Sequence, residues 1–508
     1  MSKLVVVLAV LSIAAPVALG CGRDEEASSA SSLAPEASVI YGEVTLKPQG
    51  DQKEAVDTIV SKFPGEGSAG ERLRTLFDKA LNDSSTPLSY EDDIEPWLGD
   101  EAALFVAGSN MAQGAALIAT EDEDKARATL EKGVEGKVTK KTHRDVEYLL
   151  DNGDAGGGAQ AGAVFDGFLV LGSEAGVKAA IDASEGGAQL ADSDNYKNAI
   201  DDVSDDRLGL FYLNSPQLLK DNTNAAAGVP ENFKRIFDEP TVATIDADKD
   251  GVVLETSLPE ATADTIPFLG QGSELITELP ADVWLALAQP DFDKTLDFFV
   301  ESAAGFAGGR DALERQFKTS TGLDLQRDVL DWMGDFGVFV RGTTESDVNG
   351  AVIIETSDEA ASGRVIERLR KLAETQADNP GDRVVSAPGG GEGFTLVSRS
   401  IPRPLHLFRR GGRVVLAFGD EAAADAVDAK QRLGDSAGYI PAADSLGDYD
   451  VSFYVAVAPI LQLVESTGAA SDADWQKAKP YLEPLEALVG GTSGDGDGLK
   501  SAFKVIVK

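Results

Sequence analysis

The stretch STPLSYEDDIEPWLGD, residues 85–100, returns later in the chain as STGLDLQRDVLDWMGD, residues 320–335, without a gap. Seven positions are identical at a constant offset of 235 residues: Ser85/Ser320, Thr86/Thr321, Leu88/Leu323, Asp93/Asp328, Trp97/Trp332, Gly99/Gly334 and Asp100/Asp335. Further matches follow in the same order, such as FLVLGSEA (168–175) with VLAFGDEA (415–422). Several matches in one order indicate an internal duplication.

Each half shows the same sequence of expected elements. These are a strand (39–46; 283–288), helices with apolar residues every three or four positions (52–63 and 70–81; 292–306 and 310–317), the tryptophan segment, two paired strands (102–107 and 115–119; 337–340 and 351–355) and an alanine-rich helix (121–132; 358–376). More strands follow, separated by glycine turns. Strands outnumber helices and are joined by short turns, which predicts α+β halves, each an antiparallel sheet with packed helices.

We predict one repeat at residues 34–262 and another at 273–508, with the boundary near 261–272, where Pro, Gly and Thr gather. Trp97 and Trp332 are expected to lie buried in equivalent places behind Gly-Asp turns.

The N-terminal end carries an export signal. Lys3 precedes an apolar run at residues 4–19, and the single cysteine of the chain, Cys21, follows directly in the sequence VALGC. This arrangement is typical of a secretory signal that ends in a lipobox. We therefore predict a signal peptide at 1–20, a diacylglyceryl anchor on Cys21 and a flexible polar tether over 21–33.

Two alternatives to the lipid anchor stay open. Ala18 and Leu19 depart from the usual lipobox, so an ordinary signal peptide with a coincidental cysteine is the first. A transmembrane anchor is less favoured, because the apolar run is shorter than the roughly 20 residues that a spanning helix needs.

The composition limits the function further. A net charge of −41 argues against nucleic acid and against electrostatic docking on anionic lipid, and it is typical of a solvated surface. At 43% hydrophobic residues, the chain of 508 residues can bury substantial cores. Once Cys21 is lipidated, no thiol is left for a disulfide, a redox pair or a cysteine metal site.

Three segments resemble a known family. They are YEDDIEPWLGDEAALFV (90–106), LKPQGDQKEAVDTIVSKFPG (46–65) and DNYKNAIDDVSDDRLGLFYLN (194–214). They look like the bacterial lipoproteins grouped as domain of unknown function 3352, found mainly in actinobacteria, and the resemblance covers nearly the whole mature chain. It implies a secreted or lipid-anchored envelope protein and supplies no catalytic residues.

Motifs for catalysis are weak. The two histidines, His143 in a basic turn and His406 in a strand-like run, do not occupy matching places, and we expect structural roles for both. The sequence has no GxSxG, HExxH, P-loop or strand-turn-helix GxGxxG pattern. Ser501 to Lys504 match S-x-x-K but alternate like a strand, and the glycine triplets at 156–158 and 389–391 are expected to be hairpin loops. We predict no catalytic residue and no cofactor.

Calcium is the strongest metal candidate, because residues 246–251 read DADKDG. An EF-hand loop needs a glutamate at its twelfth position, which is Ser257 here, so we expect an ordinary hairpin turn and predict no metal site. We expect the same of residues 495–498, with weak calcium binding as the minority alternative. For Asp93, Asp100 and their counterparts Asp328 and Asp335 we expect capping or turn roles.

One basic stretch interrupts the acidic chain. It holds Arg399, Arg403, Arg409, Arg410 and Arg413, with no acidic residue between Arg399 and Arg413, and the corresponding part of the first half, around 162–168, has no arginine. The simpler interpretation is pairing with carboxylates of the chain itself. The functional hypothesis is a docking strip for an anionic envelope partner.

The sequence thus favours a lipid-anchored protein at the extracytoplasmic face of the cell membrane, acting as a non-enzymatic binding or structural module. The alternative is a hydrolase or isomerase that acts on envelope polymers with two carboxylates as acid and base. A cleft with two carboxylates about 5 to 10 Å apart, one of them with a raised pKa, would distinguish the enzyme.

Overall fold

The computed structural model describes residues 29–65, 71–72, 74–75, 78, 88–108, 112–133, 138–151, 160–221, 234, 237–258, 271–376, 382–494 and 498–508. The chain divides into two compact units. The described residues up to 221 and those at 237–258 belong to the first unit, and those from 271 onward belong to the second. Among the described residues, no helix combines the length and apolarity needed to cross a membrane.

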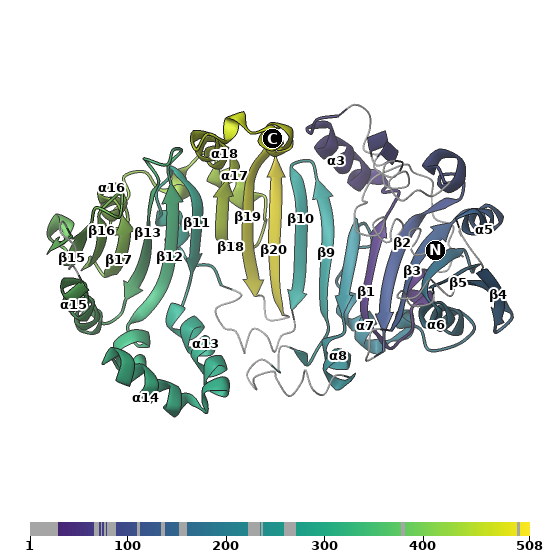
Figure 1. The fold of residues 1–508 in the computed structure, drawn as a ribbon, viewed down its shortest axis with the longest axis horizontal. Helices are drawn as coiled ribbons and strands as arrows, with labels where there is room; N and C mark the ends of the chain where they lie inside the picture. The colour runs from purple at the N-terminus through teal and green to yellow at the C-terminus, as the bar shows by residue number, and fades with distance from the viewer. Residues whose placement is uncertain are drawn as a thin grey trace. The chain divides into compact units, whose positions relative to one another are not determined.

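The first unit is built on an antiparallel sheet with the strand order β4-β5-β6-β7-β3-β2-β1-β8-β9-β10 (Figure 1). Its strands are β1 (Ser38–Thr45), β2 (Leu98–Ala107), β3 (Gln113–Thr120), β4 (Val138–His143), β5 (Val146–Asp151), β6 (Gln160–Phe165), β7 (Phe168–Ser173), β8 (Gly209–Leu213), β9 (Thr241–Asp248) and β10 (Gly251–Leu258). Its helical elements are α2 (Ala30–Leu33), α3 (Gly50–Ser61), η1 (Tyr90–Ile94), α5 (Glu123–Lys132), α6 (Glu174–Ser184), η2 (Leu190–Asp192), α7 (Asp194–Ile200) and α8 (Ser215–Asp221).

Apolar side chains cover both faces of this sheet, because successive residues of a strand point to opposite sides. In β7, Val170 belongs to the core beneath α6, together with Phe105 and Ile181. Its neighbour Leu169 belongs to the core beneath α5, together with Trp97. The sheet therefore lies between two helical layers.

The second unit has the strand order β14-β15-β16-β17-β13-β12-β11-β18-β19-β20, which is the order of the first unit, strand for strand. Its strands are β11 (Val283–Gln289), β12 (Met333–Arg341), β13 (Asn349–Thr356), β14 (Arg383–Ser386), β15 (Glu392–Val397), β16 (Leu405–Arg410), β17 (Arg413–Phe418), β18 (Asp450–Ala456), β19 (Leu485–Gly494) and β20 (Leu499–Val507). Its helical elements are α12 (Leu275–Glu278), α13 (Phe292–Ala307), α14 (Arg310–Thr321), η4 (Leu325–Leu330), α15 (Glu359–Gln376), η5 (Pro388–Gly390), α16 (Asp420–Asp425), η6 (Leu433–Asp435), α17 (Tyr439–Asp444), α18 (Val457–Ser466), η7 (Ala469–Ser471) and α19 (Ala473–Leu482). The prediction of α+β architecture on antiparallel sheets is confirmed.

Both units also bend their sheets at the same strand. The pairing register shifts in β2 between Leu98 and Ala102, and in β12 between Met333 and Phe336. Gly99 lies in the first of these bulges, where an added Cβ would come within 2.7 Å of the Ala119 backbone. A larger residue would push the adjacent strand away, so the close approach requires glycine.

The two matched stretches form the same capped π-helical turn. In the first unit, the Ser89 hydroxyl accepts the N–H of Asp92, and the Asp93 carboxylate accepts the N–H of Ser89 at 2.8 Å. In the second, Asp324 accepts the N–H of Arg327, and Asp328 accepts the N–H of Asp324 at 2.9 Å. Asp93 and Asp328 therefore hold corresponding turns closed, as the sequence predicts.

The two tryptophans seal these turns. Trp97 is 1% exposed and donates from Nε1 to the carbonyl oxygen of Asp93 at 2.5 Å. Trp332 is 3% exposed and donates to the carbonyl oxygen of Asp328 at 3.0 Å. Each buried indole thus has an acceptor four residues before it, so the polar N–H enters the core without an unmet hydrogen bond.

The predicted tether over 21–33 extends too far. Ala30 and Leu33 are 0% and 1% exposed, and α2 packs against α6 and η2. The small polar residues around them hid this apolar contact in the sequence. The helix expected at 70–81 lies mostly outside the described residues, as do Cys21 and the glycines at 156–158. The glycines at 389–391 connect β14 to β15, as expected.

Replacing either tryptophan by alanine removes a large buried ring and its hydrogen bond. We expect Trp97→Ala and Trp332→Ala each to lower the free energy of unfolding by roughly 3 to 5 kcal/mol, measured by urea denaturation. Tyr481→Ala, at a side chain 55% exposed, serves as the control and should change it by less than about 0.5 kcal/mol. A cost at either tryptophan no larger than that of the control would contradict the role in the core.

Candidate functional site

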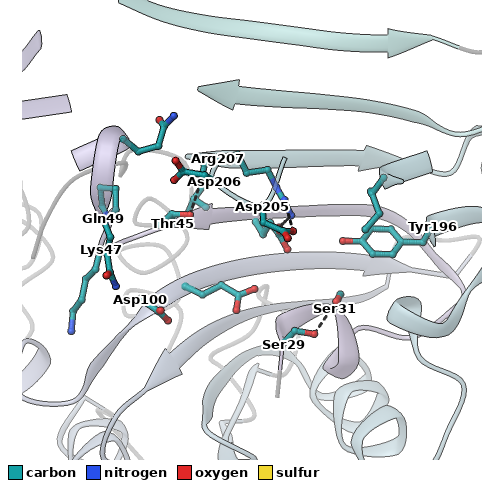
Figure 2. Close-up of a pocket in the computed structure, with 17 residues that line it drawn as sticks. Ser29, Ser31, Thr45, Lys47, Gln49, Asp100, Tyr196, Asp205, Asp206 and Arg207 are labelled. Carbon is teal, nitrogen blue, oxygen red and sulfur yellow. Dashed lines mark hydrogen bonds and ion pairs between the residues drawn. The ribbon is translucent and has the colours of Figure 1, made fainter. Parts of the chain in front are cut away.

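The first unit contains a polar pocket of about 450 Å³ (Figure 2). Its wall is formed by Ser29 and Ser31 at the start of α2, Glu43 on β1, Tyr196 on α7 and Arg207 just before β8. The pocket therefore joins segments that are far apart in the sequence. The strand order that brings β8 beside β1 is what creates it.

An ion pair forms one wall of the pocket. Arg207 pairs with Glu43, and the two side chains are only 14% and 16% exposed. Glu43 also accepts a hydrogen bond from the hydroxyl of Tyr41 at 2.6 Å. Burial raises the pKa of Tyr41, so its hydroxyl keeps the proton that it donates. Arg207 donates a further bond to the carbonyl of Ser204 at 2.7 Å, which fixes the guanidinium in place.

Aromatic rings fix the wall around Tyr196. The ring of Tyr196 lies edge-on to Tyr41 at 5.7 Å and to Tyr212 at 5.1 Å between centroids. Burial raises the pKa of Tyr196, and it raises that of Tyr212 to about 12, so both phenols are neutral at ordinary pH. Figure 2 shows the Tyr196 hydroxyl directed towards the middle of the group of lining residues. The wall therefore offers a rigid ring with a polar tip.

The pocket is acidic. Five carboxylates line it, against the two cations Lys47 and Arg207; they are Glu43, Asp100, Glu101, Asp205 and Asp206. The amino group of Lys47 is directed away from the centre (Figure 2) and bonds to the carbonyl of Leu98 at 2.7 Å and to Glu121 at 2.6 Å. Arg207 is neutralised by Glu43. The space is thus suited to a ligand with positive charge or hydroxyl groups.

The predicted arginine strip is divided between the two faces of its sheet. Arg409 and Arg410 are consecutive in β16, so their side chains point to opposite sides. Arg409 pairs with Glu359 at 2.6 Å and Glu392 at 2.5 Å, and Arg413 pairs with Glu278 and with Glu355 at 3.4 Å.

Of the remaining arginines, Arg403 donates to the carbonyl of Ser346, and Arg399 lies exposed in the turn before β16. Pairing inside the chain, the simpler interpretation, thus accounts for Arg409 and Arg413. The docking strip stays a prediction.

The two histidines lie in different units and away from the pocket. His143 ends β4, with Nε2 2.9 Å from a carboxylate oxygen of Asp182. His406 on β16 is 2% exposed, and its Nδ1 lies 2.8 Å from the hydroxyl of Thr395. Burial lowers the pKa of His406, so its ring is neutral at ordinary pH. These contacts fit the structural roles expected for both.

The candidate calcium loop is a hairpin turn. One carboxylate oxygen of Asp248 accepts the N–H groups of Asp250 and Gly251, both at 2.9 Å, between β9 and β10. Residues 495–497 of the second candidate lie outside the described residues, and Ser501 and Lys504 lie in β20. Within the described ranges, no group of three or more His, Cys, Asp or Glu side chains is arranged to hold a metal ion.

Sequence reasoning did not identify the pocket residues. One signal was available: Arg207 is a lone cation directly after Asp201, Asp202, Asp205 and Asp206. A single basic residue in such a run indicates a specific charge partner. That partner, Glu43, is 164 residues away and becomes visible only when β1 pairs with β8.

The Arg207 pair should be tested by a double-mutant cycle. We expect Arg207→Met to lower the free energy of unfolding by about 1 to 3 kcal/mol, because it leaves the Glu43 carboxylate partly buried without its partner. Adding Glu43→Gln should recover part of this loss, giving a coupling of about 1 kcal/mol in urea denaturation. Arg144→Met, at an exposed pair with Asp182, is the control and should cost less than about 0.5 kcal/mol. Strict additivity of the Arg207 and Glu43 changes would show that the pair contributes nothing.

Comparison with known proteins gives a family and a weak structural likeness. No curated protein matches the chain. Two structures of TP0453, in crystal forms I and IV, align at TM-scores of 0.25 and 0.24, with 6% and 8% identity. They cover 46% and 45% of this chain and 80% and 79% of theirs, a likeness too low to indicate a shared fold. Residues 4–382 match the model of a family described as protein of unknown function, DUF3352. The chain therefore belongs to the DUF3352 family.

Proposed function

We propose that this protein is a lipid-anchored binding protein at the extracytoplasmic face of the membrane, held by a lipid on Cys21. The lipobox-like VALGC and the short apolar run before it support the anchor. The pocket beside Arg207, a rigid and acidic hollow, is the observation that carries the binding role. Its walls are fixed by an ion pair and by tyrosines packed edge-to-face, so it needs little rearrangement to receive a ligand.

The start of the folded body supports a short tether. Ser29 lines the pocket, Ala30 is buried, and only residues 22–28 separate Cys21 from them. Eight peptide steps of roughly 3.5 Å reach at most about 28 Å. A lipid on Cys21 would therefore keep the pocket close to the bilayer surface.

We also propose that the two units are repeats of one ancestral module. The identical strand order, the bulges beside Gly99 and Gly334, and the capped turns sealed by Trp97 and Trp332 support this. The tyrosine cluster behind the pocket is not repeated in the second unit. Tyr41 of β1 lies opposite Phe105 and Tyr212. The residue of β11 that lies opposite Phe339 and Tyr454 in the same way is Ala286. The ligand site would then be specific to the first unit.

The chemistry of the pocket favours a small ligand with amino groups. Beyond Glu43, four carboxylates line the cavity: Asp100, Glu101, Asp205 and Asp206. Both cations of its described lining are already paired, Arg207 with Glu43 and Asp205, and Lys47 with Glu121. The hydroxyl oxygen of Tyr196 adds an acceptor for a hydrogen bond from an ammonium group. A carboxylate-based hydrolase has less support: burial raises the pKa of Asp246, but Asp246 does not line the pocket.

Membrane attachment is tested by Cys21→Ser. We expect the variant to move from the membrane fraction to the medium, because it loses the thiol that would carry the lipid. The wild-type chain should stay with membranes after a high-salt wash, as quantified by immunoblotting. A Cys21→Ser variant that remains on washed membranes would overturn the lipoprotein assignment.

Ligand binding is tested with 1,4-diaminobutane and its neutral analogue 1,4-butanediol, by calorimetry on the full chain without its signal. We expect the diamine to bind and the diol not to bind. The double variant Asp205→Asn with Asp206→Asn should weaken diamine binding at least fivefold. The control pair Asp201→Asn with Asp202→Asn removes the same charge outside the pocket lining and should change affinity less than twofold. Equal effects of the two pairs, or equal binding of the diol, would contradict a specific amine site.

A further inference from the structure

The second unit has a hollow of the opposite charge. It measures about 550 Å³ and lies beside α15 and η4, and we call it the α15 groove. Five cations line it, against the three carboxylates Asp328, Glu359 and Glu367; the cations are Arg327, Arg364, Arg368, Lys371 and Arg409. In a chain with a net charge of −41, a local excess of positive charge is an exception that needs a cause.

Three of the cations form a row. Arg364, Arg368 and Lys371 follow one another at helical spacings of four and three, so they lie on one face of α15. At a rise of 1.5 Å per residue, the row extends about 10 Å along the helix. The side chains of Arg364 and Lys371 are 52% and 62% exposed, so they are accessible to a partner.

The carboxylates of the groove are already occupied. Arg327 donates two bonds to Asp328, at 3.0 and 2.9 Å, and lowers the pKa of that carboxyl to about 2. Glu359 accepts from Arg409 at 2.6 Å. Glu367 accepts two bonds from Arg370, which lies outside the groove lining, and lies 3.6 Å from the amino group of Lys371. The negative charge nearest the row is therefore largely neutralised, mainly by the three arginines outside the row.

Two guanidinium groups keep unused donors. Arg364 comes no closer than 3.8 Å to Asp328. Arg368 donates to the carbonyl of Thr321 at 3.4 Å, which leaves most of its N–H groups available. Neither has a hydrogen bond to a carboxylate within the described residues, and both face the same hollow.

The shared architecture does not require these cations. In the strand register, Arg409 of β16 lies opposite Val414 of β17. The matching residue of the first unit is Val164, which lies opposite Leu169 and is buried. Arg327 matches Asp92, and Arg364 matches Ala128 when α5 and α15 are aligned on Asp122 and Asp358, which cap their first turns. The same fold thus exists with an apolar or acidic residue at these three places, whereas Arg368 matches another cation, Lys132, on the same alignment.

We propose that the α15 groove binds a linear polymer of phosphate groups. Guanidinium groups match phosphate oxygens in a bidentate manner. A row of cations about 10 Å long suits repeated charges better than a single anion, because one exposed ion contact contributes at most about 1 kcal/mol. A flat bilayer has no repeating strand of charge to enter a hollow, and the net charge of −41 opposes an anionic membrane surface.

The test uses the full chain without its predicted signal and measures its binding to inorganic polyphosphate of about 20 units by fluorescence anisotropy. We expect affinity to fall steeply with salt, as for other contacts between proteins and phosphate chains. The groove variant Arg364→Gln, Arg368→Gln, Lys371→Gln should lose at least tenfold in affinity, and its log–log salt slope should become shallower by roughly 2. Orthophosphate should bind at least a hundredfold more weakly than the polymer.

The matched control is Arg315→Gln, Arg383→Gln, Lys430→Gln, which removes three exposed cations of the same unit outside the groove lining. We expect a change of less than twofold and unchanged melting temperatures in both variants. Equal losses in the two variants would show general electrostatics and overturn the groove. Equal binding of polyglutamate, or binding of phosphatidylglycerol vesicles without binding of polyphosphate, would overturn the phosphate polymer. Diamine binding in the first unit should be unaffected, so the two proposals fail independently.

Discussion

The indole N–H of a buried tryptophan needs an acceptor, and in both units that acceptor is the carbonyl oxygen four residues earlier in a π-helical turn. This constraint determines much of the surrounding structure. The main-chain carbonyl of Asp93 or Asp328 accepts the indole N–H. The side chain of the same aspartate accepts the backbone N–H of the residue four positions earlier and so holds the turn together. The strand that follows bends at a register shift near its start, and this bulge contains the glycine two residues after each tryptophan.

Much of this arrangement could be predicted from the sequence, because the signals are local. Apolar periodicity located α13 and the alanine-rich composition located α15 nearly to the residue, and the matched stretches indicated capping or turn roles for Asp93 and Asp328. The pocket could not be predicted, because its central pair joins residues 164 positions apart. Local reasoning also failed at α2: the sequence ASSL is polar enough for a linker, and only the packing of Ala30 and Leu33 shows that it belongs to the core.

The two hollows show how one architecture can carry different chemistry. In the first unit, the place that Arg409 occupies in the second is taken by the apolar Val164, which joins the core around Trp97. Helix α5 there holds its last cation, Lys132, against Asp93 at 2.6 Å. In the second unit the corresponding aspartate is paired with Arg327 from its own turn, and Arg364 of α15 lies 3.8 Å from it. Several differences beside a matching turn thus change the charge of this face, with Asp92, Val164 and Ala128 in the first unit where the second has Arg327, Arg409 and Arg364.

The burial of α2 has a mechanical consequence. In a chain held at its N-terminal end, tension would enter the folded body at Ser29 and reach α2 before it reaches any strand. Behind α2 lies β1, which is paired on both sides, with β2 and with β8. Pulling along a doubly paired strand loads many hydrogen bonds in parallel, whereas a helix of four residues yields early. The first unit would therefore lengthen under load by releasing α2 and keep its sheet, while the part of the core that Ala30 and Leu33 fill would be uncovered.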